Sequence, residues 1–280
     1  TKIIIGVDHG YGNMKTAHRI FKTGVECMEE EPIVSRNFVK YKDKFYVIGE
    51  SHLVYQGNKT ESEDFHILTL AALAEELMFR GLHEANVTLA VGLPLAWMKS
   101  QGADFKRYLL KEQELHFEFR KERYHVHLCG AEVFPQGFAA IVNLGAMRGM
   151  NMLADIGNGT MNVMQIIDNK PLEKSLVTDK FGVGICMKEI QKELSKENGE
   201  DIPEMLIEPL LWNGIQGRTD VTAVKVERIA KQYAENIRKR LVDYGYKEGL
   251  VHLYVIGGGG CLLRNYTKLA GKAEVTFITD

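Results

Sequence analysis

Apolar and polar positions alternate over short stretches in the first half of the chain, which predicts hairpins around two helices. Hairpin alternation occurs in residues 3–19, 38–48 and 115–128. Residues 65–80 are apolar nearly all round and predict a buried helix, and a second helix is expected over residues 95–111. Between these helices, residues 87–91 predict a strand buried on both faces. The pattern indicates a mixed α/β fold.

The second half continues the mixture of strands and helices. From Pro135, small residues predict a helix with proline in its first turn, and a strand is expected at residues 152–156. This segment is the expected crossing between two domains, residues 1–145 and 146–280. Helices are then expected at residues 183–197, 203–212 and 220–244. A strand at residues 252–256 runs into four glycines, Gly257 to Gly260, and a short helix is expected from Cys261.

One glycine-rich turn occurs in both halves of the sequence. Residues 8–15 are Asp-His-Gly-Tyr-Gly-Asn-Met-Lys, and residues 155–162 are Asp-Ile-Gly-Asn-Gly-Thr-Met-Asn, so the pattern D-x-G-x-G-[NT]-M recurs at the same offsets. Each copy follows an apolar strand and precedes another. The repeat therefore predicts that a strand–turn–strand unit was duplicated together with the domain that contains it.

These turns have the composition of a phosphate site. Glycines after a strand allow backbone N–H groups to approach an anion closely. Asp8 and Asp155 would repel bare phosphate, but they suit Mg²⁺ and its bound waters, and Lys15 can neutralise phosphate directly. Turn capping by the two carboxylates is the alternative, and the pairing of the turns favours the binding site. The sequence has neither a P-loop pattern nor a dinucleotide-binding fingerprint in a βαβ context.

Charge and cysteine usage narrow the classes of partner. Lys plus Arg number 35 and Asp plus Glu 37, so no global field favours nucleic acid or an anionic membrane, and no apolar run reaches membrane-spanning length. The four cysteines are widely separated, which suits a reduced cytoplasm, and the first residues lack the features of a secretory signal. His125 and His127 would share one face of a strand, and we interpret the pair as hairpin surface in preference to a metal site.

Together, these elements resemble the two phosphate loops and the adenosine loop of the actin, sugar-kinase and heat-shock-chaperone ATPase superfamily. Within it, the chain resembles the ParM/StbA family of bacterial actin-like plasmid-segregation ATPases. The family's first loop, D-x-G-x-x-N-x-K, is matched by Asp8, Gly10, Asn13 and Lys15, and its second loop, D-x-G-x-x-T, by Asp155, Gly157 and Thr160. Its V-I-G-G-G run is matched by residues 255–259, and its Pro-amide dipeptide by Pro135-Gln136.

The resemblance implies the actin-like ATPase fold, with two duplicated α/β domains, each on a mixed five-stranded sheet, and a nucleotide cleft between them. It implies that Asp8 and Asp155 hold Mg²⁺ through water, that Gln136 orients the attacking water, and that ATP or GTP is the ligand. The implied nucleotide-binding residues are Gly10, Tyr11, Gly12, Asn13, Lys15, Gly157, Asn158, Gly159, Thr160, Gly257, Gly258, Gly259 and Gly260.

The implied function is a filament-forming ATPase that segregates plasmid or other DNA in the bacterial cytoplasm. Its partners would be further copies of itself and a DNA-binding adaptor of ParR type, without direct nucleic-acid or membrane binding. The alternative is a small-molecule kinase or phosphohydrolase of the same superfamily, which would need a carboxylate base and a polar substrate pocket. A monomeric chaperone ATPase would need a substrate-binding domain. Family members carry a further helix after the strand equivalent to residues 274–279, whereas this sequence ends at Asp280.

Overall fold

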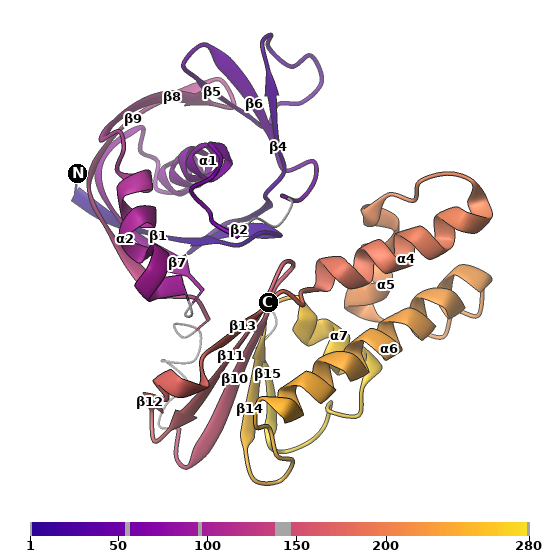
Figure 1. The fold of residues 1–280 in the computed structure, drawn as a ribbon. Helices are drawn as coiled ribbons and strands as arrows, with labels where there is room; N and C mark the ends of the chain where they lie inside the picture. The colour runs from indigo at the N-terminus through magenta and orange to yellow at the C-terminus, as the bar shows by residue number, and fades with distance from the viewer. Residues whose placement is uncertain (1, 54–56, 95–96, 138–146, 279–280) are drawn as a thin grey trace. The chain divides into compact units, whose positions relative to one another are not determined.

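The computed structural model describes residues 2–53, 57–94, 97–137 and 147–278, and the chain forms two compact units, residues 1–136 and 137–280 (Figure 1). The domain boundary expected between residues 145 and 146 lies outside the described residues and stays a prediction. Each unit has its own buried apolar core.

The first unit is built on a nine-stranded sheet with the order β3-β2-β1-β7-β9-β8-β5-β6-β4. Strands β1, β7 and β9 run parallel, and the remaining neighbours are antiparallel. The strands are β1 (Lys2–His9), β2 (Asn13–Thr16), β3 (Ile20–Lys22), β4 (Val25–Met28), β5 (Phe38–Tyr41), β6 (Lys44–Ile48), β7 (Glu84–Leu93), β8 (Glu114–Phe119) and β9 (Glu122–Pro135).

This sheet curves around helix α1 (Asp64–Phe79), as Figure 1 shows. Residues 65–77 of α1 are all buried, which confirms the prediction of a helix that is apolar nearly all round. A helix enclosed by a sheet has no water-facing side, so its apolar residues need no helical periodicity. Helix α2 (Met98–Leu109) contacts β9, and its buried residues are Gly102, Phe105 and Leu109.

The second unit contains a six-stranded sheet with the order β12-β11-β10-β14-β15, and β13 pairs with β11. Its strands are β10 (Met150–Ile156), β11 (Met161–Ile167), β12 (Lys170–Pro171), β13 (Val177–Asp179), β14 (His252–Ile256) and β15 (Val275–Ile278). The helices gather on one side of this sheet (Figure 1). They are α4 (Val183–Asn198), α5 (Glu204–Asn213), α6 (Val221–Asp243) and α7 (Gly259–Tyr266). The short 3₁₀ helix η2 (Glu173–Ser175) follows β12 and is not one of this group.

The two units share one five-stranded arrangement. The run β3-β2-β1-β7-β9 of the first unit has the same order and the same parallel and antiparallel pairings as β12-β11-β10-β14-β15 of the second. The five-stranded sheet implied by the resemblance is therefore the common part, and the first unit extends it by β8, β5, β6 and β4. This agreement supports the duplication predicted from the repeated turn.

The prediction of a helix starting at Pro135 is wrong for the residues that the structure describes. Pro135 is the last residue of β9, opposite Leu93 of β7, and Gln136 follows in a turn. The N–H of Gln136 donates to the Leu93 carbonyl oxygen at 2.8 Å. In a parallel pair only every second residue of a strand donates to a given neighbour, so Pro135, which has no N–H, stands at a position that donates no bond to β7. Strand β8 does not extend to Pro135 on the other side of β9. The rest of the expected helix, residues 138–146, lies outside the described residues.

Two other properties complete the fold. Among the described residues, no helix combines the length and the apolar composition needed to cross a bilayer. Cys27, Cys129, Cys186 and Cys261 are free cysteines.

Candidate functional site

The first glycine-rich turn joins β1 to β2, with Asp8 opposite Lys15 in the antiparallel register. A side chain at Gly10 would place its Cβ 2.5 Å from the Asn13 carbonyl oxygen, so the turn requires glycine there. Gly12 lies within the same turn, and its carbonyl oxygen accepts a hydrogen bond from Thr23. The duplicated methionine of the pattern, Met14, is fully buried.

Thr23 holds the first turn in place from the neighbouring segment. Its hydroxyl donates to the Tyr11 carbonyl oxygen at 2.6 Å, and its N–H donates to the Gly12 carbonyl oxygen at 3.2 Å. These bonds occupy carbonyl groups on one side of the turn. Backbone N–H groups are the part of such a turn that suits an anion.

The side chains of His9 and Tyr11 belong to the core of the first unit. The Tyr11 ring lies 5.4 Å from that of Phe65, and Tyr11 is only 6% exposed, so a ligand at this turn would meet its backbone. His9 is fully buried, and its Nε2 lies 2.9 Å from the Thr69 hydroxyl. Burial, and then the charge of Lys59, lowers the pKa of His9 to about 3, so this imidazole is neutral at pH 7.

Lys59 is a buried cation that the sequence patterns did not reveal, because it lies in a polar segment with the composition of a surface loop. It is 1% exposed, and its ammonium group donates to the His9 carbonyl oxygen. The ammonium group also lies 5.6, 5.3 and 5.9 Å from the ring centroids of Tyr11, Phe65 and Phe105. Lys59 thereby fixes the backbone between Asp8 and the first glycine of the turn.

Gln136 lies beside Asp8, and its side-chain amide donates to the Asp8 carboxylate. Gly92 makes room for this contact, because a Cβ there would lie 2.7 Å from Gln136 Cγ and 3.2 Å from Asp8 Oδ1. Asp8, Gly92 and Gln136 stand at or just beyond the carboxyl ends of the parallel strands β1, β7 and β9. In open α/β sheets, ligands bind at this edge. The structure thus places Gln136 beside Asp8 although it is not in a helix, and its role with the attacking water stays a prediction.

The second glycine-rich turn, residues 157–160, joins β10 to β11. Its geometry is closed by the Gly157 N–H, which donates to the Thr160 carbonyl oxygen at 2.9 Å, and Asp155 pairs with Asn162 in the register where Asp8 pairs with Lys15. Thr160 is buried, and so is Met161, the equivalent of the buried methionine of the first copy.

Helix α4 starts directly against this second turn. The N–H groups of Val183 and Gly184 donate to the carbonyl oxygens of Gly157 and Asn158, both at 2.9 Å. A Cβ at Gly182 would lie 2.2 Å from the Asn158 carbonyl oxygen. The turn, including Gly159, is therefore held by its carbonyl side, and glycine at residue 182 allows the helix to approach.

The glycine run of residues 257–260 connects β14 to α7 and packs closely on β10. Gly257 has φ of +79°, and a Cβ there would lie 2.6 Å from the Ile156 carbonyl oxygen and 3.1 Å from Asp155 Oδ1. A Cβ at Gly259 would lie 2.1 Å from Ile156 Cγ2. Gly258 is the residue before α7, and Gly259 and Gly260 form the helix's first turn. The close approach to Ile156 and Asp155 therefore requires glycine at residues 257 and 259.

The sequence-predicted residues therefore form one group in each unit. In the first, Asp8 lies by Lys15, Gln136 and the turn of residues 10–13; in the second, Asp155 lies by the turn of residues 157–160 and the glycine run. A carboxylate, glycine-lined backbone and the ends of parallel strands occur in both. This combination suits a phosphate ligand with a hydrated cation.

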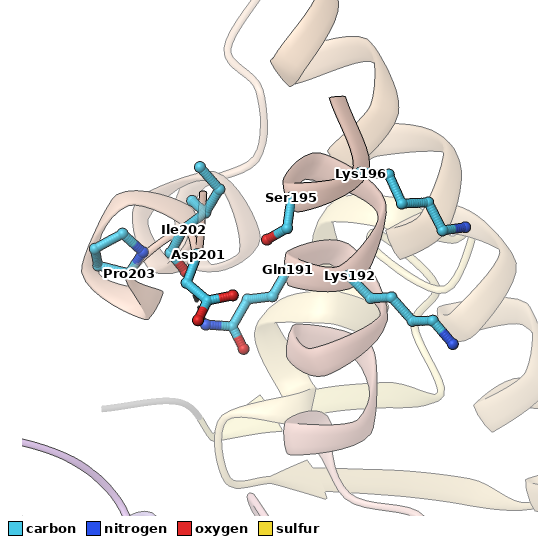
Figure 2. Close-up of a pocket in the computed structure, with 7 residues that line it drawn as sticks. All are labelled: Gln191, Lys192, Ser195, Lys196, Asp201, Ile202 and Pro203. Carbon is cyan, nitrogen blue, oxygen red and sulfur yellow. Dashed lines mark hydrogen bonds between the residues drawn. The ribbon is translucent and has the colours of Figure 1, made fainter. Parts of the chain in front are cut away.

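A hollow of about 710 Å³ lies elsewhere in the second unit, between the C-terminal half of α4 and residues 201–203 (Figure 2). Gln191 donates across it from its side-chain amide to the Ile202 carbonyl oxygen at 2.8 Å. Figure 2 shows Lys192 and Lys196 extending from α4 away from residues 201–203. Because α4 meets the second glycine turn at its opposite end, and no predicted site residue lines the hollow, we do not assign it to the candidate site.

Comparisons with known proteins agree with the fold. Residues 6–138 match the family model described as actin like proteins N terminal domain. An archaeal actin homolog from Thermoplasma volcanium is 24% identical over 93% of this chain and 89% of its own length. A 15-stranded ParM filament from Clostridium botulinum has a TM-score of 0.76 at 20% identity, covering 99% of this chain and 95% of that chain. An archaeal actin homolog solved in complex with ADP has a TM-score of 0.69 at 19% identity, covering 99% and 93%.

Proposed function

We propose that this protein is a filament-forming actin-like ATPase, because residues 6–138 match the model of the actin-like N-terminal domain and the chain has the fold of ParM and the archaeal actin homologs. We further propose that it binds and hydrolyses Mg-ATP or Mg-GTP and uses the resulting filaments to segregate plasmid or other DNA in a bacterial cytoplasm.

One observation carries the proposal. The same glycine turn, preceded by an aspartate at the end of a strand, occurs at the same point of the same five-stranded arrangement in both units. A turn kept only to join two strands needs no carboxylate, whereas a hydrated Mg²⁺ beside phosphates does. The ADP bound by a protein of this fold supports a nucleotide as the ligand. That a single nucleotide contacts both turns stays a prediction from the repeat.

The proposed chemistry depends on positioning, because the phosphoryl-transfer transition state is loose and gains most from placed charges and a placed water. Asp8 and Asp155 would hold the waters of Mg²⁺, and Lys15 would neutralise the β- and γ-phosphates. Gln136 donates to Asp8 through its nitrogen, and its amide oxygen is an acceptor for a proton of the attacking water. The nucleotide-binding backbone would be residues 10–13, 157–160 and 257–260.

Assembly would follow from the nucleotide state. A ligand shifts a conformational equilibrium by its differential affinity for the two forms, and the γ-phosphate supplies that difference between the triphosphate and diphosphate states. A head-to-tail contact that does not close into a ring produces an open helical polymer. The ParM filament of similar fold supports such a contact. With a formal net charge of −2, the chain would reach DNA through an adaptor of ParR type.

Electron microscopy and light scattering test the assembly. Scattering should rise on addition of Mg-ATP or Mg-GTP above a critical protein concentration and decay as nucleotide is consumed. Filaments should be visible while scattering is high. A protein that hydrolyses nucleotide but never sediments, with either triphosphate up to tens of micromolar protein, would instead support a soluble kinase or phosphohydrolase.

Gln136→Ala tests the assignment of the site. Loss of one positioned hydrogen-bonding group costs about 10²–10³ in rate, so turnover should fall by this factor while nucleotide affinity stays within a few-fold. Filaments should then persist. Gln191→Ala is the matched control, since that amide bonds to the Ile202 carbonyl oxygen away from both turns. Equal loss of binding and turnover in Gln136→Ala would assign Gln136 to packing.

A further inference from the structure

Four side chains of types that can bind a metal ion, one Glu and three His, gather on the outer face of β8 and β9, away from the glycine turns. The antiparallel register sets Glu114 opposite His127 and His116 opposite His125, so all four project from the same face of the sheet. The sequence pattern pointed to His125 and His127 alone. Pairing of β8 with β9 adds the carboxylate of Glu114 and the imidazole of His116 to the same face.

The opposite faces of both strands fix this arrangement. Leu115 and Phe117 of β8, and Tyr124 and Val126 of β9, are each at most 4% exposed. A slip of one residue would bury the polar set and expose these apolar side chains, so the register is strongly specified. Strand β9 also pairs with β7, and β8 with β5, which holds the two strands inside the sheet. The polar group is therefore presented on a rigid backbone.

The ligand atoms already lie close together. The rings of His116 and His125 stack with centroids 4.2 Å apart and planes 13° from parallel. Glu114 Oε2 lies 3.1 Å from His125 Nε2, and one ligand atom each from Glu114, His116 and His125 lie within 4.8 Å of one another. On the other side of the carboxylate, Oε1 lies 2.5 Å from His127 Nδ1.

We propose that Glu114, His116 and His125 form a binding site for a late first-row divalent metal ion, with Zn²⁺ as the ion of best fit. Two imidazoles and one carboxylate are a common protein ligand set for Zn²⁺ and leave a fourth position for water. Bond lengths of about 2.0–2.2 Å need ligand atoms roughly 3.3 Å apart, so the exposed imidazoles must tilt out of their stacked arrangement to share one ion. His127 orients the carboxylate from outside the metal's ligand set.

The surroundings offer a further carboxylate and space for a fourth ligand. Glu84 of β7 is in register with His125, so a second carboxylate stands next to the group. A cavity of about 430 Å³, lined in part by His83, Glu84, His116 and His125, leaves room for water over it, although Lys40, Lys42 and Arg123 also line the same cavity. The site lies in one unit and is independent of the proposed nucleotide site.

Metal titration of the full chain, without a histidine tag and after treatment with chelator, tests the site. Co²⁺ should give the absorption of a four-coordinate site at one equivalent, and Zn²⁺ should displace it. His116→Ala and His125→Ala should each weaken binding by more than the roughly 10–100-fold that loss of an outer-shell partner costs, and His127→Gln should fall within that range. Zn²⁺ should raise the melting temperature of the wild type and leave that of the two alanine variants unchanged.

The control variants distinguish this site from other side chains of the protein that could bind Co²⁺. His252→Ala removes a histidine of the second unit, which bonds to Thr276, and should bind Co²⁺ like the wild type. Melting without metal verifies that the variants fold, as expected for substitutions on an exposed face. Cys129 is exposed on the same strand, so Cys129→Ser should also bind normally. No one-equivalent binding by the wild type at about 100 μM Co²⁺, a thiolate-to-cobalt band, or unchanged binding by His116→Ala would overturn the proposal.

Discussion

Acidification from pH 7 to pH 5 is expected to destabilise the first unit through two buried histidines. Burial, and then the charge of Lys59, lowers the pKa of His9 to about 3. Burial, and then the charge of Lys111, lowers the pKa of His66, on α1, to about 4. In the unfolded chain both imidazoles have a pKa near 6.5. Below pH 6.5 the two imidazoles therefore bind protons in the unfolded state but not in the folded state, and the free energy of unfolding falls as the pH falls.

The magnitude follows from the distance between the two pKa values. Each pKa unit corresponds to about 1.36 kcal/mol, and pH 5 lies about 1.5 units below the unfolded value but above both folded values. Each histidine should thus cost about 2 kcal/mol at pH 5, and the pair about 4 kcal/mol. This loss is a large fraction of a typical domain stability of about 5–15 kcal/mol. Above pH 6.5 both imidazoles are neutral in both states, and their effect vanishes.

Urea unfolding at pH 7, 6 and 5 measures this loss. The chain has two tryptophans, Trp97 in the first unit and Trp212 in the second, so a Trp212→Phe background reports the first unit by fluorescence. His66→Gln should reduce the stability lost between pH 7 and pH 5 by about 2 kcal/mol. Equal losses with and without His66, or an NMR titration of the His66 ring near pH 6.5 in the folded protein, would refute the reasoning.

Three further substitutions test how the candidate site is built. Lys59→Met leaves the carbonyl oxygen of His9 without this donor and should cost about 1–3 kcal/mol in urea unfolding, with weaker binding of nucleotide in calorimetry. Gly182→Ala would force a Cβ to within 2.2 Å of the Asn158 carbonyl oxygen, and it should cost about 1–3 kcal/mol in thermal melts and displace the second turn. Asp155→Ala should abolish Mg-dependent hydrolysis in a phosphate-release assay while the melting temperature changes little, because this carboxylate is expected to contribute to metal binding more than to packing.

Two of these substitutions have a direct control. Gly102→Ala, in α2 with nothing within 4 Å of its Cβ, should stabilise the helix by about 0.5–1 kcal/mol, in contrast to Gly182→Ala. Asp201→Ala removes a carboxylate beside the hollow at α4 and should leave hydrolysis intact. Near wild-type hydrolysis by Asp155→Ala would make the repeated turn structural, and unchanged stability in Lys59→Met would show that the buried ammonium does not hold β1.

Local sequence patterns were enough to predict the elements whose causes are local. Glycines bounded by apolar strands predicted the turns after Asp8 and Asp155, because a tight turn and its flanking strands leave their pattern in adjacent residues. The long helix α6 followed from apolar residues at helical spacing, and α1 from a run too long and too apolar for a strand. The repeat predicted the duplication because both copies of the strand–turn–strand unit keep the same offsets.

Tertiary structure alone decided what depends on partners distant in the sequence. Pro135 suits the first turn of a helix as well as the end of a strand, and pairing of β9 with β7 settled the choice. Lys59 has a polar local sequence, and only the rings that surround it explain its burial. The hairpins of residues 38–48 and 115–128 were predicted from the sequence, but their addition to the edge of the five-stranded arrangement was not, because it depends on the pairing of β8 with β5 and of β9 with β7. These are long-range choices, since short strands gain stability only from the neighbours that the fold provides.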